Sequence, residues 1–376
     1  MNRASQLSVL ADGDPGNSIL LCDLLDEWLS AGNVEQASAR LITAPRALRE
    51  LPGVRFREAR CALLRGDAAM AIGLLKPLLA DMQDVPFGVV HDLAYAQLLE
   101  GKPVDALETL SHAQAQGEEV VACSLLKARI LHRQKQLEAA LEVLAPIDGG
   151  ARLSEVQGMR ALLWLDIGDT VRASAEAERA LTADPDQHEA GIVRGTVALW
   201  SQQVQESTAV FERVLAKHPE SGRALFGLGQ DVMLRGDVPG ARALLECASG
   251  YMPDHIGTWH TLAWCQLMQG DLAGAKHSFD KAFALDRTFG ETHGGFALVH
   301  ALRGERKEAE ESIKRATRLD PQGRSARYAQ SVLLLDEGRV EEARAIIDNI
   351  ITRTPGLGVV SADFIFRLRE LVRPRG

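Results

Sequence analysis

The sequence predicts an all-α fold, a solenoid of about ten helical hairpins followed by a closing helix. Three sets of residues recur with a step of 34 positions between Gly168 and Pro355, which is typical of a stacked array of helical hairpins. Each hairpin of such an array packs only on its neighbours. The length of 376 residues therefore counts repeats rather than globular domains.

Each set marks one point of the repeat. One set closes the repeat with proline, at Pro185, Pro219, Pro253, Pro321 and Pro355, with Arg287 at the remaining position. Another places a small residue early in the second helix, at Ala173, Ala241, Ala275, Ala309 and Ala343, with Ser207 in the gap. A third places glycine between the helices, at Gly168, Gly236, Gly270, Gly304 and Gly338, with Gln202 as the exception. Chance agreement of three sets is not a credible explanation.

The turn inside each hairpin explains the glycines. The chain leaves the first helix in a backbone conformation that costs other residues strain. Earlier turns are predicted at Gly32, Gly66 and Gly101, with Lys135 as a second deviating turn. Aspartates follow several turns and are expected to cap the next helix through a side-chain oxygen: Asp67, Asp169, Asp237 and Asp271.

The small residue early in the second helix lets the two helices of a hairpin approach closely. In the N-terminal half this position is predicted at Ala37, Ala71, Ala106 and Ala140. A larger side chain there would push the pair apart.

Prolines interrupt the N-terminal half. Pro77 and Pro146 fall inside second helices, where proline removes a hydrogen bond and clashes with the preceding turn. The helix after Gln136 is therefore expected to end or bend near Ala145. Residues 148–152 are a candidate seam between two blocks, and a local kink in one continuous superhelix is the alternative.

Four segments follow from this pattern. Residues 1–17 are expected to form a flexible segment or a partial cap. Residues 18–153 form an N-terminal block of degenerate repeats, and residues 154–357 form a C-terminal block of regular repeats. Residues 358–376 hold a capping helix, predicted over 361–372, and a tail. A capping helix would cover the apolar face of the last repeat.

These residues resemble the tetratricopeptide repeat (TPR) family, whose pattern includes a small-small pair in the first helix, an early alanine in the second and a closing proline. The resemblance covers roughly residues 18–357 and is strongest from Ser154 onward. It implies a right-handed superhelical solenoid, in which the first helices line a concave groove that binds a peptide or a helix of a partner protein.

Composition narrows the function classes. A net charge of −9 argues against a general nucleic-acid or phosphate-binding role, which needs clustered cations. Five scattered cysteines without a C-x-x-C pair fit a reducing compartment. Residues 1–17 contain no signal-peptide run, and no stretch reaches the roughly 18 apolar residues of a membrane span. We therefore expect a cytoplasmic protein without a membrane role.

Ten repeats leave no room for a catalytic domain, and no P-loop, H-E-x-x-H or G-x-S-x-G motif occurs. We expect no enzyme activity and no cofactor. His260 and His293 lie on neighbouring first helices with Glu291 as a further candidate ligand, but packed or surface histidines are favoured over a metal site.

Projection of the family's groove positions gives the candidate partner-binding residues. The C-terminal groove is apolar and aromatic, and comprises Phe226, Gln230, Met233, His260, Trp264, Leu267, Leu298, Tyr328 and Val332. The N-terminal groove is basic and aromatic, and comprises Arg57, Arg60, His91, Tyr95 and Arg129, with His132 beside them. Such side chains concentrate binding energy when exposed, and the alternative is that curvature buries them against each other.

The predicted function is a non-enzymatic scaffold, adaptor or chaperone that binds a protein or peptide partner. A regulatory or assembly subunit of a separate enzyme, for example a glycosyltransferase, is the first alternative. RNA binding is a less favoured alternative, and homo-oligomerisation stays open. The sequence does not identify the partner or the pathway.

Overall fold

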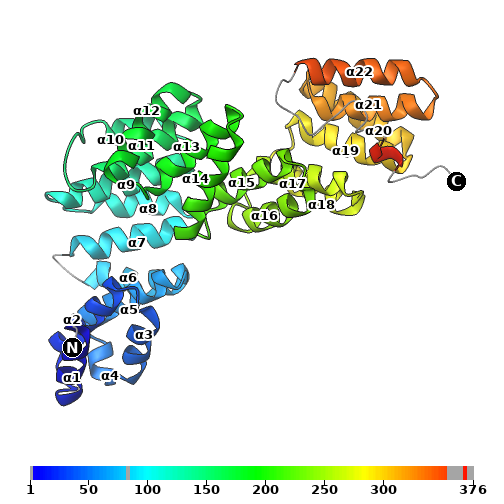
Figure 1. Cartoon of the computed structure of the whole chain (residues 1–376). Coiled ribbons are helices and arrows are strands. Elements are labelled where there is room, and N and C mark those ends of the chain that lie inside the picture. Colours follow the sequence, from blue (N-terminus) through cyan, green and yellow to red (C-terminus); the bar gives the residue numbers. More distant parts are fainter. Residues whose placement is uncertain (1–2, 82–84, 354–366, 371–376) are drawn as a thin grey trace. The chain divides into compact units, whose positions relative to one another are not determined.

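The computed structural model of the protein describes residues 3–81, 85–353 and 367–370. Within these ranges every regular element is an α-helix, and ten pairs of consecutive helices form hairpins (Figure 1). The predicted all-α array of helical hairpins is confirmed. The chain divides into two compact units, Met1–Ala180 and Leu181–Gly376.

The first unit begins with a single helix and continues with hairpins. The helix is α1 (Arg3–Gly13). The hairpins are α2 (Ser18–Ser30) with α3 (Val34–Thr43), α5 (Pro52–Leu64) with α6 (Ala68–Asp81), α7 (Phe87–Leu99) with α8 (Pro103–Ser111), α9 (Glu118–Arg133) with α10 (Leu137–Leu144), and α11 (Leu153–Ile167) with α12 (Thr170–Ala183). A four-residue helix, α4 (Arg46–Arg49), joins the first hairpin to the second.

The second unit contains the regular repeats. Its hairpins are α13 (His188–Trp200) with α14 (Val204–Lys217), α15 (Gly222–Leu234) with α16 (Val238–Tyr251), α17 (Ile256–Met268) with α18 (Leu272–Leu285), α19 (Gly290–Arg303) with α20 (Arg306–Leu319), and α21 (Arg324–Asp336) with α22 (Val340–Arg353).

The hairpin turns have the predicted backbone conformation. Gly32, Gly66, Gly101, Gly168, Gly236, Gly270, Gly304 and Gly338 all have positive φ. Lys135 and Gln202, the two deviating turns, have φ of 63° and 61° and are the non-glycine residues with positive φ in the described chain. The turn geometry is therefore kept even where its preferred residue is missing.

The predicted caps and close contacts are also present. The carboxylates of Asp67, Asp169, Asp237 and Asp271 each accept a hydrogen bond of 2.8–2.9 Å from the backbone N–H three residues later. Every residue of the small-residue set has 0% exposed surface, from Ala37 to Ala343 and including Ser207. These positions fix how closely the helices of each hairpin approach.

The two prolines of the first unit differ in effect. Helix α6 continues past Pro77 to Asp81, whereas α10 ends at Leu144 with Ala145 as its C-cap residue, directly before Pro146, as predicted. The sequence-based division at residue 153 concerns repeat regularity and stays a prediction. The division by packing falls at Ala180.

Both terminal segments contain helix. In residues 3–17, left open between a flexible segment and a partial cap, α1 packs on α2 and buries Ala11. Of the predicted capping helix, residues 361–366 and 371–372 lie outside the described residues. Residues 367–370 are helical, Leu368 is buried in a core cluster with Ile347 and Ile350, and Arg369 forms an ion pair with Asp336 at 2.8 Å.

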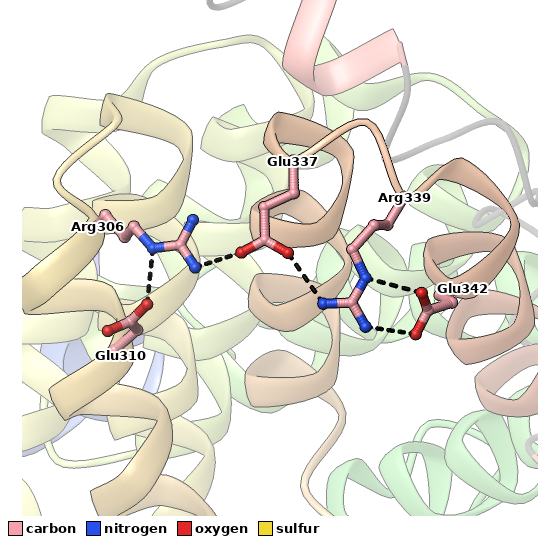
Figure 2. A network of polar contacts seen from close by, with 5 residues as sticks. All are labelled: Arg306, Glu310, Glu337, Arg339 and Glu342. Atoms are coloured by element: carbon pink, nitrogen blue, oxygen red, sulfur yellow. Dashed lines mark hydrogen bonds and ion pairs between the residues drawn. The ribbon is translucent and has the colours of Figure 1, made fainter.

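The interior is a series of local cores, as expected for an array. Polar side chains join adjacent hairpins at their turns. Figure 2 shows one such network, in which Arg306 at the start of α20 binds Glu310 and Glu337, and Arg339 binds Glu337 and Glu342. Because these groups are solvent-exposed and screened by water, the ion pairs contribute little to stability, and the network mainly orients the turns.

Candidate binding site

Four first helices of the second unit enclose a cavity of about 360 Å³, which we call the aromatic cavity. Helix α15 contributes Phe226, Gln230 and Met233. Helix α17 contributes Ile256, Gly257, His260, Thr261, Trp264 and Met268. The starts of α19 and α21 contribute Phe289, Glu291, Arg324, Ser325 and Tyr328.

The repeat positions explain why these side chains meet. Phe226, His260 and Tyr328 occupy one position of the repeat, at steps of 34 or 68 residues, and Gln230 and Trp264 occupy another. Residues at one repeat position lie on equivalent faces of neighbouring first helices. The regular spacing therefore gathers aromatic side chains on one side of the unit.

Five of the fourteen wall residues are aromatic: Phe226, His260, Trp264, Phe289 and Tyr328. The rings of Trp264 and Tyr328 meet edge to face with centroids 5.6 Å apart, and those of His260 and Phe289 do so at 5.2 Å. Edge-to-face contacts of this kind stabilise ring pairs beyond their burial. Phe289 is 38% exposed, whereas Tyr328 is 3% exposed, so the cavity has an open aromatic edge and a closed aromatic end.

Glu291 and His260, two polar residues of the wall, have hydrogen-bond partners inside the protein. The carboxylate of Glu291 accepts hydrogen bonds from the backbone N–H of Arg324 at 2.5 Å and of Ser325 at 3.1 Å, and from the Ser325 hydroxyl at 2.5 Å. It thereby caps α21 from the preceding repeat. His260 Nε2 lies 2.8 Å from Thr292 Oγ1, and Thr292 is fully buried.

Burial controls the protonation of two wall residues. Burial lowers the pKa of His260 to about 4, against an opposing effect of the Glu291 carboxylate. Burial also raises the pKa of Tyr328 to about 12. Both side chains are therefore neutral near pH 7 and present a cavity suited to apolar groups.

The structure brings six of the nine C-terminal candidates together in the aromatic cavity: Phe226, Gln230, Met233, His260, Trp264 and Tyr328. It places Leu267, Leu298 and Val332 in the core, each with 0% exposed surface. A partner cannot reach these three without rearranging the helices. For them, the alternative of mutual packing describes the structure.

The N-terminal candidates have acidic neighbours. Arg57 forms an ion pair with Asp26 at 2.5 Å, and Arg60 forms one with Asp92 at 3.6 Å. His91 Nδ1 also lies 3.1 Å from Asp92.

Two further N-terminal candidates remain at least partly exposed, since Arg129 is half-buried and Tyr95 is 38% exposed. Beside them, His132 Nε2 lies 2.6 Å from an Asp166 carboxylate oxygen. Acidic neighbours therefore offset much of the positive charge that the sequence suggested for this groove.

Several wall residues were not among the predicted partner-binding residues: Ile256, Gly257, Thr261, Met268, Phe289, Glu291, Arg324 and Ser325. Ile256 and Arg324 are the first residues of their helices, and Phe289 is the N-cap residue of α19. The projection counted only the middle of each first helix. The signal that could have found them is the 34-residue step that connects Ile256, Gly290 and Arg324.

The two histidines considered as metal ligands have separate hydrogen bonds. His293 Nε2 donates to the carbonyl oxygen of Arg287 at 2.9 Å, whereas His260 pairs with Thr292. In the described ranges, no group of three or more His, Cys, Asp or Glu side chains is placed to hold a metal ion. Among the described helices, none combines the length and apolar character needed to cross a membrane.

Comparison with known proteins points to one repeat family. Residues 192–249 and 296–357 match the family model described as tetratricopeptide repeat. A TPR repeat-containing protein of Pseudomonas aeruginosa is 30% identical over 92 residues, which cover 24% of this chain and 88% of that protein.

Cellulose synthase operon protein C of Xanthomonas axonopodis pv. citri is 29% identical over 251 residues. The match covers 64% of this chain and spans 14% of the length of that relative. Among solved structures, that of PilF from Pseudomonas aeruginosa has a TM-score of 0.43 at 18% identity, over 55% of this chain and 95% of that chain.

Proposed function

Because the chain belongs to the tetratricopeptide repeat family, we propose that it is a non-enzymatic scaffold, adaptor or chaperone whose second unit holds a segment of a partner protein in the aromatic cavity. The aromatic cavity is the observation that carries this proposal. Binding pockets are typically concave and mainly apolar, with a few fixed polar groups.

The proposed mode of binding is the insertion of apolar side chains from one chain segment. A volume of about 360 Å³ lies near the lower end of ligand pockets, so it suits one or two side chains rather than a domain. Trp264 and Phe226 stand on adjacent first helices and present aromatic surface, which is enriched where binding energy concentrates.

Affinity capture followed by mass spectrometry tests the proposal. The full chain, the double variant Trp264→Ala with Phe226→Ala, and the variant Trp200→Ala are compared as baits. Trp200 is 58% exposed and lies outside the aromatic cavity, so it is the matched control. We expect a partner that the control retains and the double variant loses by about tenfold or more.

Equal recovery by all three baits would refute the aromatic cavity as the binding site. Binding of single-stranded RNA that weakens with added salt would instead favour the nucleic-acid alternative.

A second candidate is a regulatory or assembly subunit of a separate enzyme, for example a glycosyltransferase. The relative named cellulose synthase operon protein C supports it. Enzyme activity that copurifies with the wild-type chain, and not with the double variant, would favour this candidate over a general scaffold.

For the location we propose the cytoplasm, supported by five free thiols at Cys22, Cys61, Cys123, Cys247 and Cys265. Fractionation of cells with a tagged chain tests this, and recovery outside the cytoplasm would contradict it.

A further inference from the structure

One repeat has glycine at a position where neighbouring repeats carry aromatic side chains. The repeat position of Phe226, His260 and Tyr328 is occupied in α19 by Gly294, 34 residues after His260 and 34 before Tyr328. A Cβ atom on Gly294 would lie 2.7 Å from the backbone nitrogen of Ala326 and 2.8 Å from Ser325 Cβ. Glycine therefore allows α21 to pack directly on α19.

This close packing closes one end of the cavity. With no side chain on Gly294 between them, Trp264 of α17 and Tyr328 of α21 come into ring contact although they belong to repeats that are not adjacent. An apolar side chain of a bound segment can occupy the aromatic cavity in front of these rings.

Positive charge lies beside the same end. Arg324 lines the aromatic cavity and is exposed, and its guanidinium has no hydrogen bond or ion pair to any other described residue. Arg327 is one helical turn further along α21, and its guanidinium binds the neutral amide oxygen of Asn349 at 2.6 Å.

The nearby carboxylates form hydrogen bonds with backbone N–H and hydroxyl groups and not with the Arg324 guanidinium. Glu291 accepts three hydrogen bonds at the start of α21. Asp320 accepts the backbone N–H of Gln322 at 3.0 Å. Arg324 is therefore the described cation of the cavity wall that remains available to a carboxylate from outside.

We propose that the segment bound in the aromatic cavity carries an apolar anchor side chain with acidic residues next to it on the side of α21. The anchor fills the aromatic cavity in front of Trp264 and Tyr328, and the carboxylates lie against Arg324 and Arg327. This inference rests on the proposed function and adds the chemistry of the partner. Nucleic acid fits less well, because Tyr328 is 3% exposed and its ring face is not available for base stacking.

Selection from a display library of short random peptides on the full chain tests the inference. We expect enriched peptides that combine an aromatic or large aliphatic residue with neighbouring Asp or Glu. Enrichment should be lost on Trp264→Ala and should shift from acidic to basic neighbours on Arg324→Glu. Lys307→Glu is the matched charge control, because Lys307 is exposed on α20 and does not line the cavity.

A selected peptide then gives a quantitative test. Replacing its acidic residue by the amide should weaken binding to the wild-type chain by about threefold to tenfold. The same replacement should have no effect on binding to Arg324→Gln. This double-mutant cycle isolates the interaction between Arg324 and the acidic residue of the peptide. It does so because the Arg324 guanidinium has no partner among the described residues that Arg324→Gln would leave unpaired.

The remaining outcomes separate the two proposals. Apolar peptides without an acidic preference, or an acidic preference unchanged in Arg324→Glu, would overturn the inference and leave the proposed function standing. No enrichment, or enrichment unaffected by Trp264→Ala, would overturn both. Self-association of the chain that Trp264→Ala abolishes would make a second copy the occupant and would also overturn the inference, as would cavity-dependent binding of single-stranded RNA.

Discussion

His260 carries the pH sensitivity of the aromatic cavity. Burial lowers its pKa from 6.5 to about 4. His260 is therefore protonated below about pH 6.5 in the unfolded chain but only below about pH 4 in the folded chain. We expect the free energy of unfolding to fall by up to about 3 kcal/mol across this range because of His260.

Denaturant unfolding at a series of pH values measures this contribution. His260→Gln should lose less stability than wild type on acidification from pH 6.5 to pH 4. Near neutral pH, the difference in stability between the two proteins should be smaller than at pH 4. A pH dependence that is the same in both proteins would contradict the prediction.

Asp231 is a buried carboxylate with an incomplete set of partners. It has 0% exposed surface, and its Oδ2 accepts a hydrogen bond from Ser207 at 2.5 Å, whereas its Oδ1 has no hydrogen-bond partner in the described structure. Burial raises its pKa, so the carboxyl group favours folding in its protonated form, and this contribution is lost as pH rises through the raised pKa.

We therefore expect Asp231→Asn to increase the free energy of unfolding near pH 7 by about 1 kcal/mol. Thermal or denaturant unfolding measures it. Glu212→Gln, on the exposed face of α14, is the control and should change little. A less stable Asp231→Asn protein would mean that the carboxylate has a stabilising role that its contacts do not reveal.

At the scale of the helical elements, the two unusual turns carry strain. Gln202 has φ of 61°, a conformation that costs a residue with a Cβ atom about 1 kcal/mol more than glycine. Gln202→Gly should therefore raise the free energy of unfolding by about that amount. Gly236→Ala is the matched opposite change, because its φ is +85° and an added Cβ would meet open space. The Gly236→Ala protein should be less stable than wild type. Equal melting temperatures for wild type, Gln202→Gly and Gly236→Ala would contradict the argument that these turns favour glycine.

The contact between α19 and α21 depends on Gly294. Gly294→Ala places a Cβ atom within 2.7 Å of backbone, so we expect a loss of about 1–3 kcal/mol and a weaker Trp264–Tyr328 contact. Gly250→Ala is the control, because Gly250 lies in α16 with nothing within 4 Å of an added Cβ. It should be neutral or slightly stabilising, since alanine favours helix. Unfolding curves compare the two, and similar effects would argue against a tight contact.

The same elements show what the sequence could predict. Three repeating residue sets were enough to locate the hairpins, the turns at Lys135 and Gln202 and the aspartate caps, because those features depend on local backbone chemistry. The sequence left open whether Leu267, Leu298 and Val332 are exposed or buried, because their burial depends on how closely neighbouring hairpins pack. The ion pairs of Arg57 and Arg60 were missed for a related reason. Arg57 and Asp26 are 31 residues apart, so their pairing does not follow the 34-residue step of the three repeating residue sets.

On the scale of the whole molecule, stability is distributed over local cores. The second unit contains its own core clusters, around Leu245 and Leu262 and around Phe279 and Leu298. Because the aromatic cavity is built from that unit alone, a fragment of residues 184–376, which begins after α12, should fold and keep the binding properties of the full chain.

Circular dichroism with thermal melting checks whether the fragment folds, and binding of a selected peptide checks its cavity. A fragment without helical signal, or one that is folded but does not bind the peptide, would show that the first unit contributes to the site.

Gly294 also limits how this site can diverge among related chains. Gly294 is the residue on which two hairpins meet beside the aromatic cavity, so enlarging it would damage the scaffold before it altered selectivity. New preferences are therefore expected to arise at Phe226 on one side and Arg324 on the other, where substitutions change the rim and spare the contact beneath it.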